Sequence, residues 1–185
     1  MTNFMKKGII LFKSKYGAAE KYAYWLAELT GYDCVKLSET AMREAAGYET
    51  IVLCGGIYAS GIAGLSFLKK HIAGLRGRKT AVFCVGASPY DEKAFQEIKL
   101  HNMKNELSGI PLFYGRGIWD ESKMTFKDRT LCRMLQKALA KKDPADYEPW
   151  MEACMSAVGQ TCDWTDRSYL IPLQEYLEEG AEGKE

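Results

Sequence analysis

Three segments of small residues carry the groups that could bind a ligand. The first follows an apolar run and leads directly into a helical pattern. Its residues are Ser14, Lys15, Tyr16, Gly17, Ala18 and Ala19. A turn of this kind lets backbone N–H groups and a helix N-terminus converge on an anion, with Ser14 adding a hydroxyl and Lys15 a charge. The alternative is an ordinary turn in which Gly17 supplies a positive φ.

The other two segments also follow apolar runs, and each combines small residues with one tyrosine. One reads Gly56, Ile57, Tyr58, Ala59, Ser60 and Gly61, and the other reads Gly86, Ala87, Ser88, Pro89 and Tyr90. Glycines permit a backbone to approach a flat ligand closely, and a tyrosine ring can stack on one. Half-buried packing is the alternative for either tyrosine alone. Together with the anion-type turn, the two loops predict a clamp for a planar heterocycle.

Other common site patterns are missing from the sequence. Gly56 and Gly61 have the separation of a P-loop, but Ile62 and Ala63 follow where that motif needs Lys and Ser or Thr. No Gly-x-Gly-x-x-Gly follows a strand, and no Gly-x-Ser-x-Gly occurs. Six cysteines without a C-x-x-C pair and two histidines predict no metal site. His71 and His101 are expected on helices, away from the strand ends, so we expect no catalytic side chain.

Alternating strands and helices must position these loops. Short apolar runs predict buried strands at 8–12, 50–54 and 80–85, and weaker ones at 33–37 and 111–115. Helical spacing appears at 19–29, 39–46, 65–75, 95–103 and 131–139. Gly31 is a good residue to end the first helix, and Thr125 with Asp128 resembles a capping box before the last. Five alternations predict an α/β layer sandwich with a parallel sheet, whose carboxyl edge carries the three loops.

Length and charge limit the classes of protein. The chain has 185 residues, 47% of them hydrophobic, and a formal charge of +1. That composition supports a sizeable core, and the near-zero charge argues against a nucleic-acid partner. The apolar stretches are too short for a membrane span, and Lys6 and Lys7 precede too short an apolar core for a secretory signal. Unpaired, strand-borne cysteines fit a cytoplasmic location.

The chain divides unevenly by pattern. The α/β pattern ends near Lys142, which predicts a domain over residues 1–142 and a helical extension over residues 143–185. Within the extension, Met151 to Val158 keep helical spacing up to Gly159, and a last helix begins near Pro172. We expect the extension to pack on the same domain and its last residues to fray.

The sequence resembles the flavodoxin family over residues 8–141. The matching motifs are Ser14–Gly17, Gly55–Gly61 and Gly86–Tyr90. More narrowly it is similar to the flavodoxin-domain group that includes the menaquinone-dependent protoporphyrinogen oxidases. That narrower similarity lies in Gly115–Ile118, Lys123–Arg129 and Asp163–Tyr169.

The resemblance implies a flavodoxin-like three-layer sandwich with strand order 2-1-3-4-5 and FMN as the cofactor. It implies that the phosphate lies on the Ser14–Ala19 turn and that the isoalloxazine lies between the other two loops. The implied function is an oxidoreductase acting on a small-molecule redox substrate, of porphyrinogen or quinone type. The alternatives are an electron carrier with a redox protein partner and a flavin-free interaction domain.

Two departures from the family pattern affect that expectation. Ala19 stands where the family's turn usually ends in a hydroxyl residue, so one side-chain contact to the phosphate is missing. Simple electron-carrier flavodoxins are strongly acidic, whereas this chain has a charge of +1. The near-neutral charge favours an enzyme over a carrier, and the sequence leaves the oligomeric state open.

Overall fold

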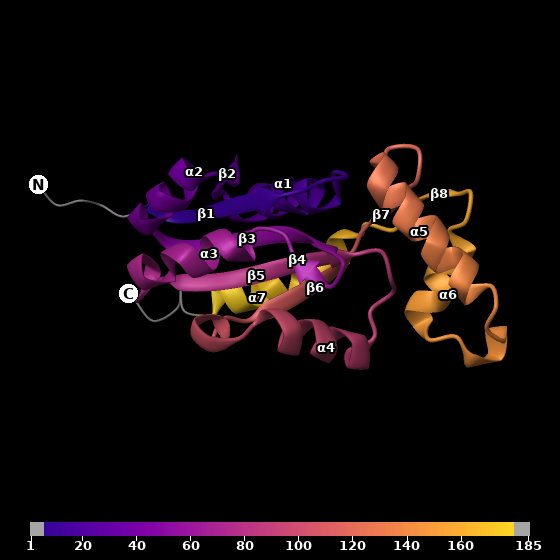
Figure 1. The fold of residues 1–185 in the computed structure, drawn as a ribbon. Helices are drawn as coiled ribbons and strands as arrows, with labels where there is room; N and C mark the ends of the chain where they lie inside the picture. The colour runs from indigo at the N-terminus through magenta and orange to yellow at the C-terminus, as the bar shows by residue number, and fades with distance from the viewer. Residues whose placement is uncertain (1–5, 180–185) are drawn as a thin grey trace, which may run out of the picture.

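The computed structural model describes residues 6–179, and its main body is a central sheet of parallel strands with helices on both faces (Figure 1). Five parallel strands lie in the order β2-β1-β3-β5-β6. They are β1 (Lys6–Lys13), β2 (Asp33–Lys36), β3 (Tyr48–Tyr58), β5 (Lys79–Gly86) and β6 (Leu112–Arg116). This order confirms the expected 2-1-3-4-5 sheet and the α/β sandwich. The predicted fraying of the last residues falls on 180–185, outside the described residues.

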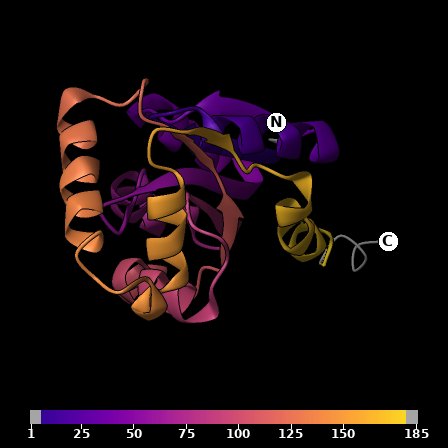
Figure 2. The same cartoon turned by 90° about the vertical axis from the view of Figure 1, so that its right-hand side faces the viewer.

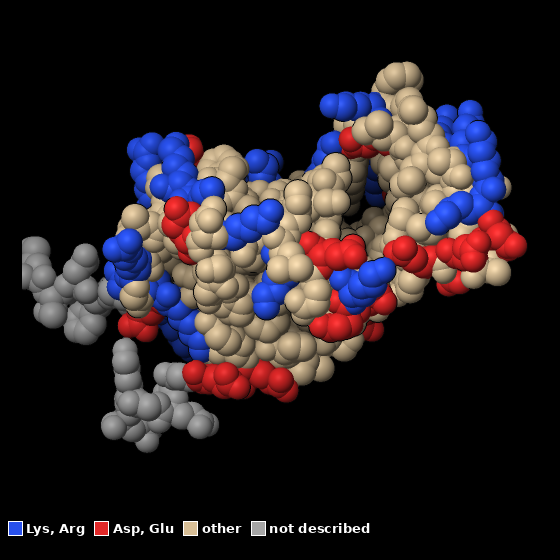
Figure 3. Space-filling model, turned by 60° about the horizontal axis from the view of Figure 1, so that its bottom comes forward, with Lys and Arg blue, Asp and Glu red and all other residues tan. Residues whose placement is uncertain are grey.

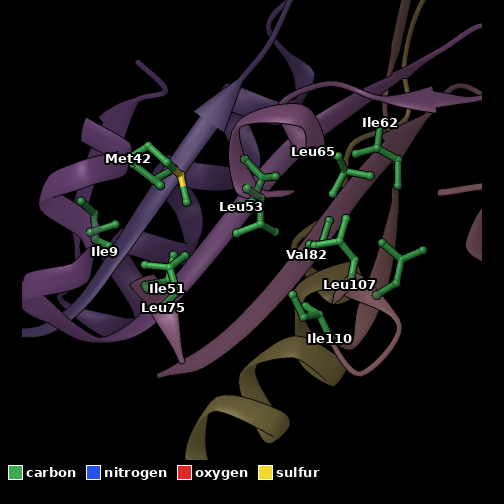
Figure 4. Close-up of a cluster of buried hydrophobic side chains, with 14 of the residues drawn as sticks. Ile9, Met42, Ile51, Leu53, Ile62, Leu65, Leu75, Val82, Leu107 and Ile110 are labelled. Atoms are coloured by element: carbon green, nitrogen blue, oxygen red, sulfur yellow. The ribbon is translucent and has the colours of Figure 1, made fainter. Parts of the chain in front are cut away.

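Successive residues of the central strands enter two separate cores. Ile9 and Leu53 belong to the core under α2 (Glu39–Glu44), α3 (Leu65–His71) and α4 (Glu92–Asn102), part of which Figure 4 shows. Ile10 and Val52 belong to the core under α1 (Ala18–Thr30) and α7 (Ile171–Glu178). Continuous apolar runs suit strands buried on both faces, as predicted, because both pleat directions meet a helix layer.

Helix α1 starts at the carboxyl edge of the sheet, directly after the anion-type turn. Its N-terminal residue follows Gly17, and it ends at Gly31, whose φ is +68° and whose N–H donates to the carbonyl of Ala27 at 2.8 Å. The left-handed glycine therefore ends the helix as the sequence predicted. The helix buries Tyr22 and Leu26 against the sheet, which fixes the turn before it.

The segment after β3 is a tight hairpin rather than an open loop. Strand β4 (Gly61–Ile62) pairs antiparallel with the end of β3, so only two residues, Ala59 and Ser60, make the turn. Both have positive φ, at 47° and 67°. Positive φ at both central positions is what a two-residue hairpin requires to match the twist of its strands.

Beyond β6 the chain leaves the sheet and builds a unit at its carboxyl edge (Figures 1 and 2). This α5–α6 unit comprises β7 (Ile118–Asp120), α5 (Phe126–Leu139), α6 (Pro149–Ser156) and β8 (Thr161–Asp163). Strands β7 and β8 pair antiparallel in a small sheet of their own. The remaining short elements are 3₁₀ turns: η1 (Ala45–Gly47), η2 (Ile72–Leu75), η3 (Asn105–Leu107), η4 (Pro144–Asp146) and η5 (Arg167–Leu170).

Helix α5 forms over the predicted residues but does not cover the sheet, as the fifth helix of the alternation was expected to do. Its apolar stripe stays largely open, with Leu131 and Met134 54% and 62% exposed. Helix α7 covers the sheet instead, through buried Leu173 and Leu177. Helix α5 does not reach the sheet because β7 carries the chain past the sheet edge, so that α5 begins beyond that edge. No helix within residues 6–179 is long and apolar enough to cross a membrane.

Candidate functional site

The anion-type turn is ordered by its own backbone. The hydroxyl of Ser14 accepts a hydrogen bond from the N–H of Gly17 at 3.0 Å. Gly17 has a φ of +92°, as the sequence suggested, and a Cβ placed there would meet no atom within 4 Å. No side chain caps the first turn of α1. The N-terminus of a 13-residue helix therefore faces open space with its amides free for an acceptor.

The side chains of the turn are engaged by the α5–α6 unit. The Lys15 ammonium and the Tyr16 hydroxyl both donate to the carboxylate of Asp128, in the first turn of α5. This contact raises the pKa of Lys15 and lowers the pKa of Asp128. Only half of the expected capping box forms, because Thr125 accepts from the N–H of Asp128 at 3.2 Å while the carboxylate turns to Lys15.

Tyr58 packs against this turn instead of facing solvent. Its hydroxyl accepts from the backbone N–H of Lys15 at 2.8 Å, and its ring meets that of Tyr16 edge-on at 6.1 Å. Partial burial raises the pKa of Tyr58. A Cβ on Gly56 would lie 2.5 Å from the Tyr58 hydroxyl oxygen, so the ring fits over β3 only because residue 56 is glycine.

Helix α4 holds the β3–β4 hairpin in place through Asn102. The Asn102 side chain accepts from the N–H of Ile62 at 3.0 Å and donates to the carbonyl of Ser60 at 2.7 Å. One amide group therefore ties both the turn and the β4 strand of the hairpin to α4. The sequence offered no signal for this role, since a lone asparagine near a helix end usually indicates only capping.

The loop after β5 is held from β6 below it. The Arg116 side chain donates from Nε to the carbonyl of Ala87 at 3.0 Å, and the Tyr114 hydroxyl donates to the carbonyl of Ser88 at 2.6 Å. Tyr90 is 50% exposed and its hydroxyl donates to the carboxylate of Glu92, which raises the pKa of Tyr90 to about 12. The loop is thus fixed by its carbonyls, while its tyrosine ring stays accessible.

A cavity of about 360 Å³, the turn cavity, joins the three predicted segments. Ten of the predicted residues line it: Ser14, Tyr16, Ala18, Ala19, Gly56, Ile57, Tyr58, Ala59, Gly86 and Ala87. Its opposite wall comes from the α5–α6 unit and includes Trp119, Met124, Leu131 and Leu135. Backbone-rich loops on one side and apolar side chains on the other suit a flat ligand with a polar edge.

A second cavity of about 590 Å³, the α4 cavity, adjoins the first. Both cavities include Ile57, Gly86 and Ala87 in their walls. The α4 cavity adds four more predicted residues: Ser60, Ser88, Pro89 and Tyr90. Helix α4 and Trp150 of α6 complete it. The predicted segments therefore form one continuous region at the carboxyl edge of the sheet.

Several predicted positions differ in detail from the expectation. Lys15, Gly17 and Gly61 lie within the three segments but line neither cavity. Tyr58 lines the turn cavity and Tyr90 the α4 cavity, so the two rings do not form a clamp across one space.

The two histidines have different surroundings. His71 pairs with Glu39 at 3.0 Å on the surface, as expected. His101 was expected away from the strand ends, but it lines the α4 cavity because α4 runs beside the β3–β4 hairpin. Sequence spacing placed His101 on its helix correctly and could not show which face that helix turns to the site.

Comparisons with known proteins give one family match. A family model described as a flavodoxin domain matches residues 9–146. Among solved structures, a WrbA-like flavodoxin from Agrobacterium tumefaciens is 17% identical, covering 67% of this chain and 88% of that chain with a TM-score of 0.46. The Trp repressor binding protein from Bacillus subtilis is 15% identical, covering 60% of this chain and 84% of that chain with a TM-score of 0.40. No curated protein matches significantly.

Proposed function

Because the chain belongs to the flavodoxin-domain family, we propose that it binds FMN at the carboxyl edge of its sheet and works as an oxidoreductase. The observation that carries the proposal is the turn cavity, which runs from the uncapped N-terminus of α1 to the backbone of two glycine-containing loops. We propose that the phosphate binds the Ser14–Ala19 turn and that the isoalloxazine lies between the loops 56–61 and 86–90.

The residues present fit that cofactor. The phosphate end needs amides and a hydroxyl, which the first turn of α1 and Ser14 offer. The ring needs backbone that it can approach closely, and Gly56, Gly86 and Ala87 in the wall of the turn cavity carry no side chain or only a methyl group. Ala19 removes one hydroxyl from the phosphate site, and we expect weaker binding than in a turn that keeps it.

The protein's own groups would orient the ring and exclude water. FMN supplies the redox chemistry when bound, and no side-chain acid or base is required for it. Backbone groups of the 86–90 loop, held by Arg116 and Tyr114, would form fixed partners for the polar edge of the ring. The apolar side chains of Trp119, Leu131 and Leu135 would shield the ring from solvent on the α5 side.

The open apolar stripe of α5 favours an enzyme over a simple carrier. Leu131 and Leu135 line the turn cavity, yet they are 54% and 41% exposed. Such a wall over the cofactor site suits an organic substrate, and we propose one of quinone or porphyrinogen type. The near-neutral charge of +1 points the same way, because docking of a basic redox protein would favour an acidic surface.

Two measurements on the purified protein test the proposal. A yellow preparation with flavin absorbance supports it, whereas a colourless protein that does not take up added FMN leaves only a flavin-free interaction domain. Turnover with protoporphyrinogen or reduced nicotinamide and a panel of quinones then separates the remaining readings. Failure of every substrate with a fully flavin-loaded protein would favour the carrier between proteins.

A further inference from the structure

The α4 cavity extends well beyond the loops assigned to the flavin. Its volume of about 590 Å³ exceeds the 360 Å³ of the turn cavity. The two cavities share Ile57, Gly86 and Ala87, so a molecule in the α4 cavity would lie beside the ring proposed for that boundary. The far walls come from α4 and from Trp150 of α6, which lie outside the three predicted segments.

Several aromatic side chains line the α4 cavity. Tyr90 lies 5.5 Å from Phe95 and 6.0 Å from Tyr114, measured between ring centroids, and Trp150 lines the cavity from the α5–α6 unit. Tyr90 is 50% exposed, so its ring face is open to a ligand. Ring faces arranged around one space favour a planar aromatic guest, because offset and edge-on contacts between rings are attractive.

Apart from His101, the charged side chains that line the cavity are acidic. Asp91 and Glu97 line it, together with His101, and none of the lining residues is a lysine or arginine. Asp91 is already engaged as the cap of α4, accepting from the N–H of Ala94 at 2.8 Å. Glu97 is exposed, and its side chain makes no hydrogen bond or ion pair with another described residue. Its carboxylate is therefore available to a guest.

Arg116 of β6 does not offset that charge within the cavity wall. The Arg116 guanidinium stacks on the Trp164 ring at 4.0 Å, and its Nε is bound to the carbonyl of Ala87. Arg116 does not line the α4 cavity. In Figure 3, acidic side chains with a few basic ones among them lie beside the hollow between the main body and the α5–α6 unit.

From this arrangement we propose that the α4 cavity binds the second reactant, a planar aromatic molecule that is uncharged or cationic, and that Glu97 sets this preference. This inference rests on the proposed function, because a second reactant needs a bound flavin beside it. It favours a quinone over a porphyrinogen, because the carboxylate arms of a porphyrinogen would meet Glu97 and Asp91, and no lysine or arginine is among the residues that line the cavity.

Matched anthraquinones test the proposal by binding rather than by turnover. One probe carries a trimethylammonium group and the other a sulfonate, so the planar body is the same and only the charge differs. Titration calorimetry at low salt, on protein loaded with FMN, should give at least about fivefold tighter binding of the cation, the scale of one charge pair near 4 Å in water. Equal binding, or a preference for the sulfonate, would overturn the proposal.

Variants separate the roles of charge and ring. Glu97→Lys should reverse or abolish the preference for the cation, whereas Glu106→Lys, the same change at an exposed site outside both cavities, should leave it unchanged. Trp150→Ala should weaken both probes by a similar factor. An unchanged cation preference in Glu97→Lys would contradict the assignment of that residue.

The same titrations distinguish this inference from the flavin proposal. Displacement of FMN by the probes would show that the probes and FMN share one site, and it would overturn the inference alone. Charge-selective probe binding to a protein that takes up no FMN would support the cavity's preference and overturn the flavin proposal. Normal FMN uptake without probe binding would overturn the inference and leave the flavin proposal standing.

Discussion

The Asp128 carboxylate of α5 accepts hydrogen bonds from the Lys15 ammonium and from the Tyr16 hydroxyl, which lie 113 and 112 residues before it in the sequence. The contact ties the α5–α6 unit to the turn proposed for the phosphate. It also places a negative charge in the wall of the cavity that would receive a phosphate, since Ser14 and Asp128 line the same space.

Removing that charge should strengthen binding of the phosphorylated flavin selectively. In Asp128→Asn we expect FMN to bind about three- to tenfold more tightly, because a like charge within several ångströms of the phosphate is lost. Riboflavin, which lacks the phosphate, should show little change. Fluorescence titrations with both flavins check this, and Asp146→Asn, an exposed change elsewhere in the α5–α6 unit, is the control. Equal gains for both flavins would contradict an electrostatic role.

Asn102 should contribute measurably to stability. Asn102→Ala removes the bonds to Ile62 and Ser60 and leaves the partly buried Ile62 amide without its acceptor. We expect the free energy of unfolding in urea to fall by about 1–3 kcal/mol. Gln96→Ala, which loses only an exposed bond to Glu92, should stay within about 0.5 kcal/mol of the parent. Similar losses in both variants would mean that the hairpin does not depend on Asn102.

A glycine at position 60 of the β3–β4 turn should stabilise the protein. Ser60 has a φ of +67°, a conformation that costs a non-glycine residue about 1–2 kcal/mol. Ser60→Gly should therefore raise the free energy of unfolding by about 0.5–1 kcal/mol once the entropy of glycine is counted. Ser66→Gly, the same change within α3, should lower it by a similar amount. A loss at position 60 would contradict the turn described here.

Much of the fold could be predicted from local patterns. Continuous apolar runs located β1, β3 and β5, because strands buried on both faces have no polar alternation. Gly31 marked a helix end because its conformation favours glycine. The strand order came with the family resemblance, since periodicity alone does not say which strands are neighbours.

The features that the sequence did not predict depend on tertiary contacts. The stripe containing Leu131 and Met134 has helical spacing, but spacing does not specify whether a sheet or a ligand covers it. The sequence predicted Asp128 as part of a capping box. Its contact with Lys15 could not be inferred, because the two residues are far apart in the sequence. Asn102 and His101 acquire their roles only because α4 lies beside the hairpin.

Some expectations stay predictions. The boundary at residue 142, the cytoplasmic location and the narrower resemblance to protoporphyrinogen oxidases need tests of their own.

The chain returns to the sheet as α7 after the α5–α6 unit, with Leu170 and Leu173 fully buried. A truncation after residue 142 would remove those side chains from the core, and we expect it to unfold or aggregate.

The central claim is that FMN binds with its phosphate at Gly17. A titration that follows the quenching of FMN fluorescence tests it most directly, with Gly17→Val compared to Gly77→Val. Both glycines have positive φ, +92° and +79°, and open space around their Cβ positions, so backbone strain is matched. We predict saturable quenching for the parent and for Gly77→Val, and none or at least a tenfold weaker curve for Gly17→Val. No quenching by the parent, or equal affinity in all three, would contradict the account.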